Sequence, residues 1–528
     1  MAKFITAEDS AYLINDGDVV MFCADGLVGF PNEIVFATRD RFKKEQHPAN
    51  ITTFRASGMG TFRDDDWGEG AWCIDGMLTR SISSFLAVCP RLAKLVAENK
   101  VQAYMFPIGP IEQAMREVAR GFPGVLTKIG LGTFMDVRYG GGKLNKLTEE
   151  RGEDLVEYIP DFRGEEYLFY KFPKLNVCLL RGTTADANGN VSCEKETLRP
   201  GLLSLAQATK TCGGIVIVQV EKVAAVNEIH PRMVEVPGIY VDYIVVEQHP
   251  ENVPWTAARF HREDYNPGLT GEKIVQVAKD ANIMPFNEDK VIARRTAMEV
   301  PEKGLVNFGI GMPQNVPSIF VECSKPIGVT MISETGAIGG VPVMGRGDFG
   351  MHLNVESMTE RGVHFSLFDG GNLDLAVFGL SEIDADGNKN TSFLGGKPSG
   401  VGGFTNIASS TRKVIFMGTY TAGGLQTKIE NGKISIVQEG KIKKFVKKCD
   451  KPSFVGNEYL KKFPDGFMII TERCVLRYTK EGYVLEEVAE GIDIKTQIQD
   501  LSDVQFIIPK GGPAKMEPTL FTEKDFSL

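Results

Sequence analysis

The stretch Ala185-Asp-Ala-Asn-Gly-Asn190 returns almost unchanged as Ile383-Asp-Ala-Asp-Gly-Asn388, and the two copies begin 198 positions apart. Each copy follows an apolar run of strand character, at residues 177–180 and 375–379. Asp and Asn side chains bond to their own backbone and Gly readily adopts positive φ, so both copies predict the same tight turn. Two such turns in matching contexts, about half a chain apart, predict two copies of one domain.

The rest of the chain supports an α/β fold with two tandem, structurally similar domains. A chain of 528 residues is too long for one hydrophobic core. We expect an N-terminal domain at 1–275, a linker at 276–290 and a C-terminal domain at 291–528. Alternating strand-like and helix-like segments predict mostly parallel sheets covered by helices. The clearest strands are expected at 19–22, 214–220, 240–246 and 414–417, and the clearest helices at 90–98 and 111–119.

Composition and charge exclude several classes of protein. Apolar residues make up 43% of the chain and the net charge is -9, which argues against a disordered chain and against a nucleic-acid partner. The most basic stretch, at 441–448, alternates with apolar residues and is expected to be a solvated face. Nine scattered Cys residues without a C-x-x-C pair predict a reducing, cytoplasmic setting. No apolar run of 18 residues is present, so no membrane association is expected.

The segment Ser333-Glu-Thr-Gly-Ala-Ile-Gly-Gly340 is the first candidate for chemistry. It follows the apolar run 327–332, which is expected to be a buried strand. A carboxylate at the end of such a strand is costly to bury, and the glycines after it let a ligand or another backbone approach closely. Glu334 is therefore either a nucleophile at the ligand-binding edge of a sheet or the solvated residue of an ordinary turn, and spacing alone leaves both open.

Three further glycine-rich turns expose backbone N–H groups. They are Asn307-Phe-Gly-Ile-Gly-Met-Pro313, Gly400-Val-Gly-Gly-Phe404 and Gly130-Leu-Gly-Thr-Phe134. The first precedes a helix and could hold an anionic or carbonyl group. The second could form an oxyanion hole. Read alone, each is equally compatible with a flexible loop or tight turn.

Metal and nucleotide motifs are missing. Gly140-Gly-Gly-Lys143 is followed by Leu144, where a phosphate-binding loop needs Ser or Thr. The six His residues form no H-x-x-x-H pair, and Asp64-Asp-Asp66 is expected to be an acidic surface loop. No metal site and no cofactor is therefore predicted.

Several motifs occur together in a fixed order along almost the whole chain. They are Pro123-Gly-Val-Leu-Thr-Lys-Ile-Gly-Leu-Gly-Thr-Phe134, Gly141-Gly-Lys-Leu-Asn145, Val291-Ile-Ala-Arg-Arg-Thr-Ala297, Asn307–Pro313, Ser333–Gly340, Asp369-Gly-Gly371, Gly402-Gly-Phe404 and Thr419-Tyr-Thr-Ala-Gly-Gly424. With these motifs the chain resembles the family I coenzyme A (CoA) transferases, in the fused form that joins α-like and β-like halves. Acetate/propionate CoA-transferases and the succinyl-CoA:3-oxoacid enzyme belong to this family.

The resemblance implies the CoA-transferase fold and covalent, ping-pong transfer of CoA from an acyl-CoA to a carboxylic acid. Glu334 is similar to the family's catalytic glutamate, which passes through an acyl-glutamyl anhydride and a glutamyl-CoA thioester. The N–H groups of Gly403 and Phe404 would stabilise an oxyanion, with Gly402 beside them at the CoA. CoA would be a substrate, and the family usually forms homodimers or homotetramers. The residues expected to line the site are Asn307, Gly309, Gly311, Gly336, Ile108, Gly130 and Gly132.

Two departures from the family pattern concern the acyl group. Ile108 stands where relatives usually carry a Gln that polarises a substrate oxygen, and Glu334-Thr-Gly-Ala337 replaces Glu-Ser-Gly-Pro. Ile108 cannot donate a hydrogen bond, so either another group does so or the acyl pocket is more apolar. The acid is therefore expected to be either a short-chain type or a larger unsaturated or aromatic one.

Other functions remain as alternatives. Sugar-phosphate isomerases and folate cycloligases share the architecture but lack the fused duplication and the S-E-x-G loop. An acyl-CoA hydrolase would differ only in admitting water. A non-catalytic CoA-binding protein is disfavoured by the intact loop around Glu334.

Overall fold

The computed structural model describes residues 2–277 and 283–528 and divides into two compact units. Unit 1 comprises Met1–Val275, Glu334–Ser366 and Ser392–Asn406, and unit 2 comprises Gln276–Ser333, Leu367–Thr391 and Ile407–Leu528. This division differs from the expected one, because two segments of the expected C-terminal domain, 291–528, pack within unit 1. Of the expected linker 276–290, residues 278–282 lie outside the described residues, and helix α8 (Glu288–Ala297) already begins within it.

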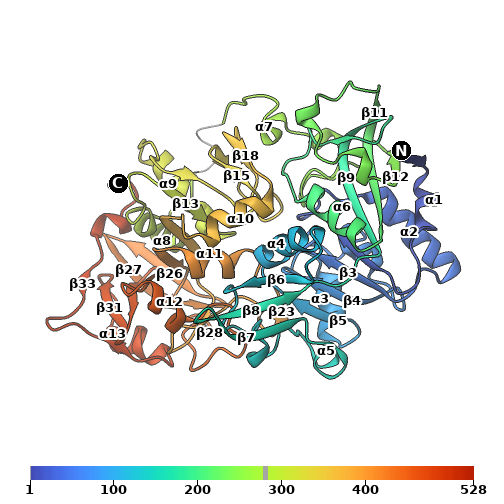
Figure 1. Cartoon of the computed structure of the whole chain (residues 1–528). Coiled ribbons are helices and arrows are strands. Elements are labelled where there is room, and N and C mark those ends of the chain that lie inside the picture. Colours follow the sequence, from blue (N-terminus) through green and yellow to red (C-terminus); the bar gives the residue numbers. More distant parts are fainter. Residues whose placement is uncertain (1, 278–282) are drawn as a thin grey trace. The chain divides into compact units, whose positions relative to one another are not determined.

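Unit 1 is built on a nine-stranded sheet (Figure 1). All its strands pair in parallel except β10 (Val191–Ser192), which pairs antiparallel with β9. In spatial order the others are β1 (Lys3–Ile5), β12 (Tyr243–Val246), β11 (Ile215–Ala224), β9 (Val177–Asp186), β2 (Val19–Phe22), β3 (Ile51–Arg55), β4 (Leu78–Ser83) and β5 (Gln102–Met105).

Helices lie on both faces of this sheet, and every residue of β9 is buried. Helix α2 (Asn32–Glu45) contributes Ile34, Val35 and Phe42 to one core cluster, together with every second residue of the central strands. Helices α4 (Ile108–Ala119) and α6 (Leu202–Thr211) pack against each other, and α6 packs on β9 and β11 (Figure 1). A parallel sheet covered on both sides explains the near-continuous apolar runs in its strands.

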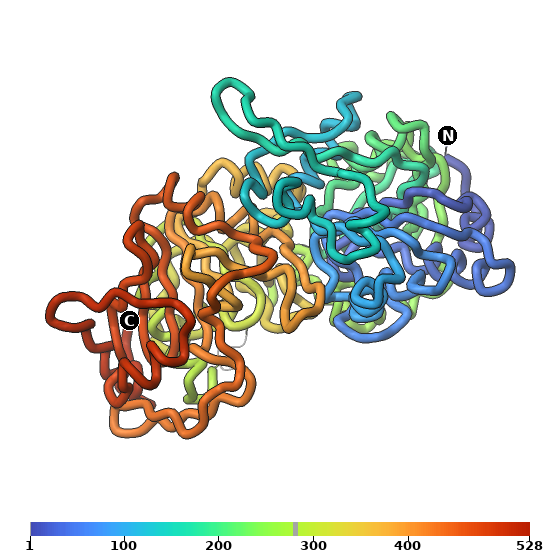
Figure 2. The backbone as a smooth tube through the Cα atoms, turned by 90° about the horizontal axis from the view of Figure 1, so that it is seen from below, coloured from blue at the N-terminus to red at the C-terminus, as the bar shows by residue number. Residues whose placement is uncertain are grey.

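A separate three-stranded antiparallel sheet also belongs to unit 1. Its order is β6 (Gly124–Thr127), β8 (Glu165–Lys171) and β7 (Val156–Phe162). The tip of the β7–β8 hairpin is exposed and extends outward in Figure 2, where it is coloured teal.

Unit 2 contains a second nine-stranded sheet, of mixed direction. Its first five strands pair in parallel, and β30 then pairs antiparallel with both of its neighbours. The spatial order is β14 (Thr330–Met331), β13 (Leu305–Phe308), β19 (Leu375–Gly379), β24 (Val414–Met417), β29 (Phe467–Ile470), β30 (Cys474–Thr479), β31 (Gly482–Val488) and β32 (Phe506–Ile507), with β33 (Ala514–Lys515) beside β31.

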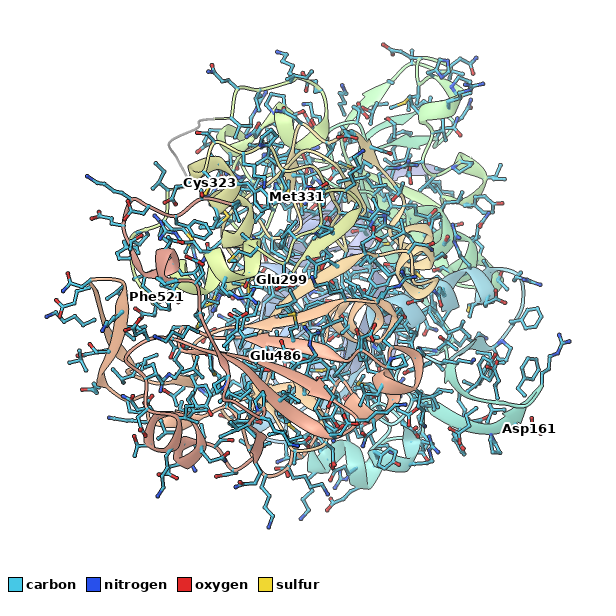
Figure 3. All side chains as sticks on the ribbon, turned by 90° about the vertical axis from the view of Figure 1, so that its left-hand side faces the viewer. Asp161, Glu299, Cys323, Met331, Glu486 and Phe521 are labelled. Atoms are coloured by element: carbon cyan, nitrogen blue, oxygen red, sulfur yellow. The ribbon has the colours of Figure 1, made fainter. Side chains whose placement is uncertain are left out.

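The core of unit 2 joins this sheet to helices α8 and α9 (Val316–Glu322) and to the C-terminal segment. Met331 of β14 and Phe521 near the C-terminus are both part of it, and both are labelled in Figure 3. Glu299, also labelled there, accepts ion pairs from Arg295 of α8 and from Lys413. The chain from Ile407 onward belongs to this unit, because its strands and C-terminal segment share one core with α8.

The repeated Asp-x-Asn/Asp-Gly-Asn turns have the same hydrogen bonds in the two units. The Asp186 carboxylate accepts from the N–H groups of Asn188 and Asn190 at 2.9 Å, and that of Asp384 accepts from Asp386 and Asn388 at 3.0 Å. Gly189 and Gly387 have φ of 85° and 72°. The turn chemistry predicted from the sequence is therefore confirmed, and so is the α/β class with large, mostly parallel sheets.

Two segments of the later half join unit 1 through backbone bonds, ion pairs and apolar contacts. The N–H of Val401 donates to Ser84 O at 2.8 Å, and the N–H of Arg361 donates to Arg199 O at 3.0 Å. Met351 completes a small core cluster with Val28, Leu198 and Leu269. These contacts, invisible in the order of the sequence, place Glu334 in unit 1. Among the described residues, no helix is long and apolar enough to span a bilayer.

Candidate active site

Glu334 is the first residue of the segment that joins unit 1, and its turn is held in place on both sides. Thr335 Oγ1 donates to Gly350 O at 2.6 Å, and Thr359 N–H donates to Gly336 O at 3.0 Å. Gly336 has φ of 104°, and a Cβ there would lie 2.2 Å from Thr359 O. Only glycine fits this position, so Gly336 shapes the loop behind the nucleophile candidate. The apolar run 327–332 forms only a short strand, β14, rather than the longer strand expected.

The backbone at residues 402–403 meets the Glu334 carboxylate directly. The Gly403 N–H donates to Glu334 Oε2 at 2.8 Å. A Cβ on Gly403 would lie 2.2 Å from the same oxygen, and one on Gly402 would lie 3.6 Å from Oε1. The absence of side chains here lets the main chain bind the carboxylate, as the sequence argument for glycine-rich turns anticipated.

The same turn is anchored within unit 1. The N–H of Gly402 donates to Ser84 O at 3.1 Å, and the N–H of Ile108 donates to Gly402 O at 3.1 Å. The N–H of Phe404 donates to Val401 O at 2.8 Å. In this structure the Phe404 N–H is thus used within the turn, and a shared oxyanion role for Gly403 and Phe404 stays a prediction.

Ile108 begins helix α4 beside Gly402 and is fully buried. The next residue, Gly109, donates its N–H to Asn406 Oδ1 at 3.3 Å, and a Cβ on Gly109 would lie 2.1 Å from Asn406 Nδ2. The backbone N–H of Ile108 bonds to the Gly402 turn, and its buried apolar side chain offers no hydrogen-bond donor.

A buried ion cluster that the sequence did not reveal lies beside Glu334. Arg361, fully buried, donates through Nε to Glu112 Oε1 at 2.6 Å and pairs through Nη1 with Asp25 Oδ2 at 3.0 Å. Glu112 is also buried, whereas the Asp25 side chain keeps 20% of its exposure. The partners are hundreds of residues apart in the chain, so no local pattern could have joined them. Only the position of Asp25 after the strand at 19–22, at the ligand-binding edge of an α/β sheet, could have drawn attention to it.

The surroundings of Glu334 raise the pKa of its carboxyl to about 7. Burial is the largest cause, and the negative charge of Asp25 acts in the same direction. The Gly403 N–H and the Arg361 guanidinium oppose the shift. Glu334 is nevertheless partly accessible to solvent. A desolvated carboxylate that remains reachable is suited to nucleophilic attack.

The remaining residues predicted from the resemblance fall in two places. Gly130 and Gly132 form a turn in unit 1: Gly132 N–H donates to Asp136 Oδ2 at 3.0 Å, and a Cβ on Gly130 would meet Tyr170, Leu168 and Met135 rather than Glu334. Their part in lining the site stays a prediction.

Asn307, Gly309 and Gly311 belong to unit 2, at the carboxyl end of β13. Asn307 Nδ2 donates to Ile332 O at 2.9 Å, Gly309 N–H donates to Val377 O at 2.8 Å, and Gly311 has φ of 90°. The bond from Asn307 fixes the end of β14 just before the segment that carries Glu334.

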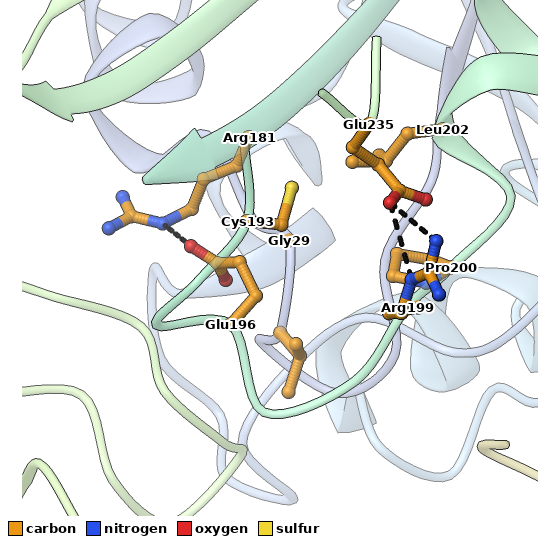
Figure 4. A pocket seen from close by; sticks show the side chains of 9 residues that line it. Gly29, Arg181, Cys193, Glu196, Arg199, Pro200, Leu202 and Glu235 are labelled. Atoms are coloured by element: carbon orange, nitrogen blue, oxygen red, sulfur yellow. Dashed lines mark hydrogen bonds and ion pairs between the residues drawn. The ribbon is translucent and has the colours of Figure 1, made fainter. Parts of the chain in front are cut away.

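A small, tightly filled hollow in unit 1 is lined by ion pairs rather than by these residues (Figure 4). Arg181 pairs with Glu196 at 3.3 Å, and Arg199 pairs with Glu235 at 2.7 Å. Arg181 also pairs with Glu247. Glu334 is not among the hollow's lining residues, although Arg361 and Met351 of the Glu334–Ser366 segment contact two of them, Arg199 and Val28.

No group of three or more His, Cys, Asp or Glu side chains positioned for a metal ion occurs in the described part of the chain. The basic stretch 441–448 is mostly exposed, but Lys444 is not: its Nζ donates to Thr419 O at 2.7 Å, and burial lowers the pKa of Lys444 to about 8.

Comparison with known proteins adds independent findings. A family model described as coenzyme A transferase matches residues 4–247. The caffeate CoA-transferase of Acetobacterium woodii is 40% identical over 99% of this chain and 98% of its own length. The acetate CoA-transferase YdiF of Escherichia coli K12 is 32% identical over 94% of this chain and 91% of its own length.

The fold is shared with solved structures over the full length. The crystal structure of the YdiF acyl-CoA transferase apoenzyme from Escherichia coli O157:H7 has a TM-score of 0.90 and 30% identity, and covers 99% of this chain and 96% of the other. A structure of the same enzyme described as a thioester complex with CoA has a TM-score of 0.88, with the same identity and coverage.

Proposed function

The chain belongs to the fused-chain family I coenzyme A transferases, and on this basis we propose that Glu334 is the nucleophile that carries CoA from an acyl-CoA to a carboxylic acid. The observation that supports this most directly is the 2.8 Å bond from the Gly403 N–H to a partly desolvated Glu334 carboxylate. The enzyme is a CoA-transferase; the covalent route and the acids are the proposal.

In the first step, a Glu334 oxygen attacks the thioester carbonyl. The carbonyl becomes an oxyanion, and its collapse expels the CoA thiolate and leaves an acyl-glutamyl anhydride. The thiolate then attacks the glutamyl carbonyl, releases the acyl carboxylate and forms the glutamyl-CoA thioester. An incoming carboxylate reverses both steps, so no atom is gained from water.

Glu334 is both activated and oriented for this chemistry. Desolvation makes its carboxylate more basic and removes water that would otherwise shield it. In the resting site the Gly403 N–H donates to the Glu334 carboxylate. When the thiolate attacks the glutamyl carbonyl, the same N–H can donate to the oxyanion that forms on Glu334, and such a donor stabilises the transition state by about 3 kcal/mol. CoA is the substrate, and the proposed route needs no bound cofactor or metal ion.

We further propose that the acid is larger than acetate, of unsaturated or aromatic type. Ile108 is buried, its backbone N–H bonds to Gly402 O, and its side chain offers no hydrogen-bond donor. A relative of 40% identity is named a caffeate CoA-transferase, and caffeate is such an acid. A relative named for acetate supports the short-chain alternative. A cytoplasmic homodimer or homotetramer completes the proposal, consistent with nine Cys residues that are all free thiols.

The covalent step can be tested by incubating the enzyme with an acyl-CoA and then with borohydride. The expected result is reduction of Glu334 alone to an alcohol, detected by peptide mass spectrometry, and the Glu334→Gln variant serves as the unreactive control. Label on another residue, or none in an enzyme that turns over, would refute the role of Glu334. CoA release without any acceptor acid would instead indicate a hydrolase.

A further inference from the structure

Asp25 lies in a tight loop whose main chain is fixed by several hydrogen bonds. The backbone groups of Asp25 and Val28 bond to each other in both directions, at 3.0 and 2.9 Å. Gly26 has φ of 59° and bonds to Gly58 O at 2.9 Å. A Cβ on Gly29 would lie 2.6 Å from Cys23 O, so this loop closes tightly on the end of β2. The main chain that carries Asp25 is therefore fixed in position.

Arg361 binds two carboxylates from separate elements. Its Nε bonds to Glu112 of α4 at 2.6 Å, and its Nη1 pairs with Asp25 at 3.0 Å. A single guanidinium therefore serves two acids, with Glu334 as a third acid close enough to interact with both Asp25 and Arg361. The single positive charge of Arg361 does not neutralise the three carboxylates of Glu112, Asp25 and Glu334. The remaining negative charge makes the ionised forms of Asp25 and Glu334, the two more accessible acids, less favourable.

The helix that carries Arg361 also contacts the Gly403 turn. Phe365 lies one helical turn after Arg361, on the same face of α10 (Arg361–Asp369). A Cβ on Gly403 would lie 3.0 Å from Phe365 Cζ, and one on Gly109 would lie 3.0 Å from Phe365 Cδ1. The start of α10 thus ties the ion cluster and the Glu334 carboxylate to one rigid element within unit 1.

The charged and titratable groups around Asp25 come from several elements. Ser57, after β3, hydrogen-bonds to it, and burial raises the pKa of Asp25 while Arg361 opposes the shift. Burial likewise raises the pKa of Glu112. The other groups of the cluster are Glu360, which pairs with Arg116, the buried thiol of Cys23, and His364, which bonds to Thr359 Oγ1 at 2.9 Å.

We propose that Asp25 is a positioning residue of the transfer reaction, whose carboxylate is held on Arg361 and fixes a negative charge in the ion cluster beside Glu334. This inference rests on the proposed role of Glu334 and assigns Asp25 no contact with the reacting atoms. A neighbouring negative charge makes Glu334 harder to ionise but more reactive once it is ionised, because nucleophilicity rises with basicity. The positive charge of Arg361 opposes the effect of Asp25 on Glu334, and its ion pair with Asp25 holds that carboxylate in place.

The test is the pH profile of kcat/KM for the Asp25→Asn variant of the full chain, from pH 5.5 to 9. The acidic limb is expected to move down by about 0.5–1 pH unit, since the like charge is lost. Activity should rise relative to the wild type below pH 6 and fall several-fold above pH 8. The two profiles therefore cross, which general damage to the fold would not produce.

Two further variants complete the experiment. Asp25→Glu keeps the charge and should keep the wild-type midpoint even if its rate falls. Glu196→Gln removes another buried carboxylate paired with a buried arginine, in the pocket of Figure 4, and should leave the midpoint unchanged. An Asp25→Asn midpoint equal to that of the wild type would overturn the inference.

Borohydride labelling of each variant separates this outcome from failure of the proposed function. If Glu334 is labelled in the wild type and in Asp25→Asn while the midpoint stays unmoved, only the role of Asp25 is refuted. If the wild type itself is not labelled at Glu334, the proposed nucleophile fails as well. Should Asp25→Asn not fold, the Asp25→Glu profile still decides: a shifted midpoint with the charge retained would contradict the electrostatic role.

Discussion

The backbone N–H of Gly403 lies 2.8 Å from Oε2 of Glu334, and any side chain at position 403 would place its Cβ 2.2 Å from the same oxygen. The carboxylate and the main chain therefore occupy a space that only glycine leaves open. This relationship joins two segments 69 residues apart and sets the position of the proposed nucleophile.

Gly403→Ala should lower kcat/KM by about 100-fold or more, because the new methyl group displaces Glu334 from the Gly403 N–H. Steady-state kinetics with a fixed acyl-CoA and acid would measure the loss. Gly213→Ala is the control: Gly213 also has positive φ, at 79°, but a Cβ there meets nothing within 4 Å. That variant should lose some stability and keep its kcat/KM, and an equal loss in both would contradict the role of the contact.

The acidic limb of the kcat/KM profile should have its midpoint near pH 7. The pKa of Glu334 is raised to about 7, and only the deprotonated carboxylate attacks, so activity should fall about tenfold per pH unit below the midpoint. Measurements from pH 5.5 upward keep simple carboxylic acids ionised throughout. A rate independent of pH over this range would show that Glu334 does not titrate there.

Glu334→Gln should stabilise the ligand-free protein at pH 8 and have little effect near pH 5. Because the folded pKa exceeds the unfolded value, stability of the wild type falls as pH rises through the interval between them, and a neutral side chain does not suffer this loss. The gain should be on the order of a few kcal/mol at most. Thermal melting at both pH values would show it, and equal effects at pH 5 and pH 8 would contradict the raised pKa.

Ile108→Gln should shift selectivity toward acetate and away from aromatic acids, because it restores a donor and removes apolar contact area. The ratio of kcat/KM for an aromatic acid to that for acetate is expected to fall by about tenfold. Ile111→Gln is the matched control, since Ile111 is buried on the same helix, one turn after the residue whose N–H bonds to Gly402 O. If both variants change the ratio equally, the Ile108 side chain is not the determinant.

Asp384→Ala should destabilise unit 2 by about 2–3 kcal/mol, since its carboxylate accepts bonds from Asp386, Asn388 and Cys449. Asp186→Ala should have a comparable effect on unit 1, where the same turn occurs. Denaturant unfolding would measure both. Asp384→Asn, which keeps an acceptor oxygen, should cost less, and a larger cost for Asn than for Ala would contradict the hydrogen-bond account.

Local patterns predicted the secondary structure well where the side chains themselves carry the signal. The strands expected at 19–22 and 414–417 are β2 and β24, and the helix expected at 90–98 is α3 (Pro90–Ala97). The run 327–332 was less informative, because apolar residues are also buried outside strands and only β14 forms there.

Some residues of the candidate site could be found from the sequence and others could not. Glu334 and the glycines at 402–403 could be singled out from the sequence, because a carboxylate and bare backbone next to strands are chemically unusual. Asp25, Glu112 and Arg361 could not, since an ion pair has no signature in the order of residues when its partners lie on separate elements.

The sequence by itself determined the α/β class and the duplicated Asp-Gly-Asn turns and proposed Glu334 as the reactive carboxylate, because these depend on local backbone chemistry and on motifs of neighbouring residues. Only the tertiary structure decided that Glu334–Ser366 and Ser392–Asn406 pack within unit 1, and that Glu334 meets the Gly403 N–H beside Asp25 and Arg361. The physical reason is that burial, close approach and charge–charge interaction depend on distances between side chains, and folding sets those distances across hundreds of residues.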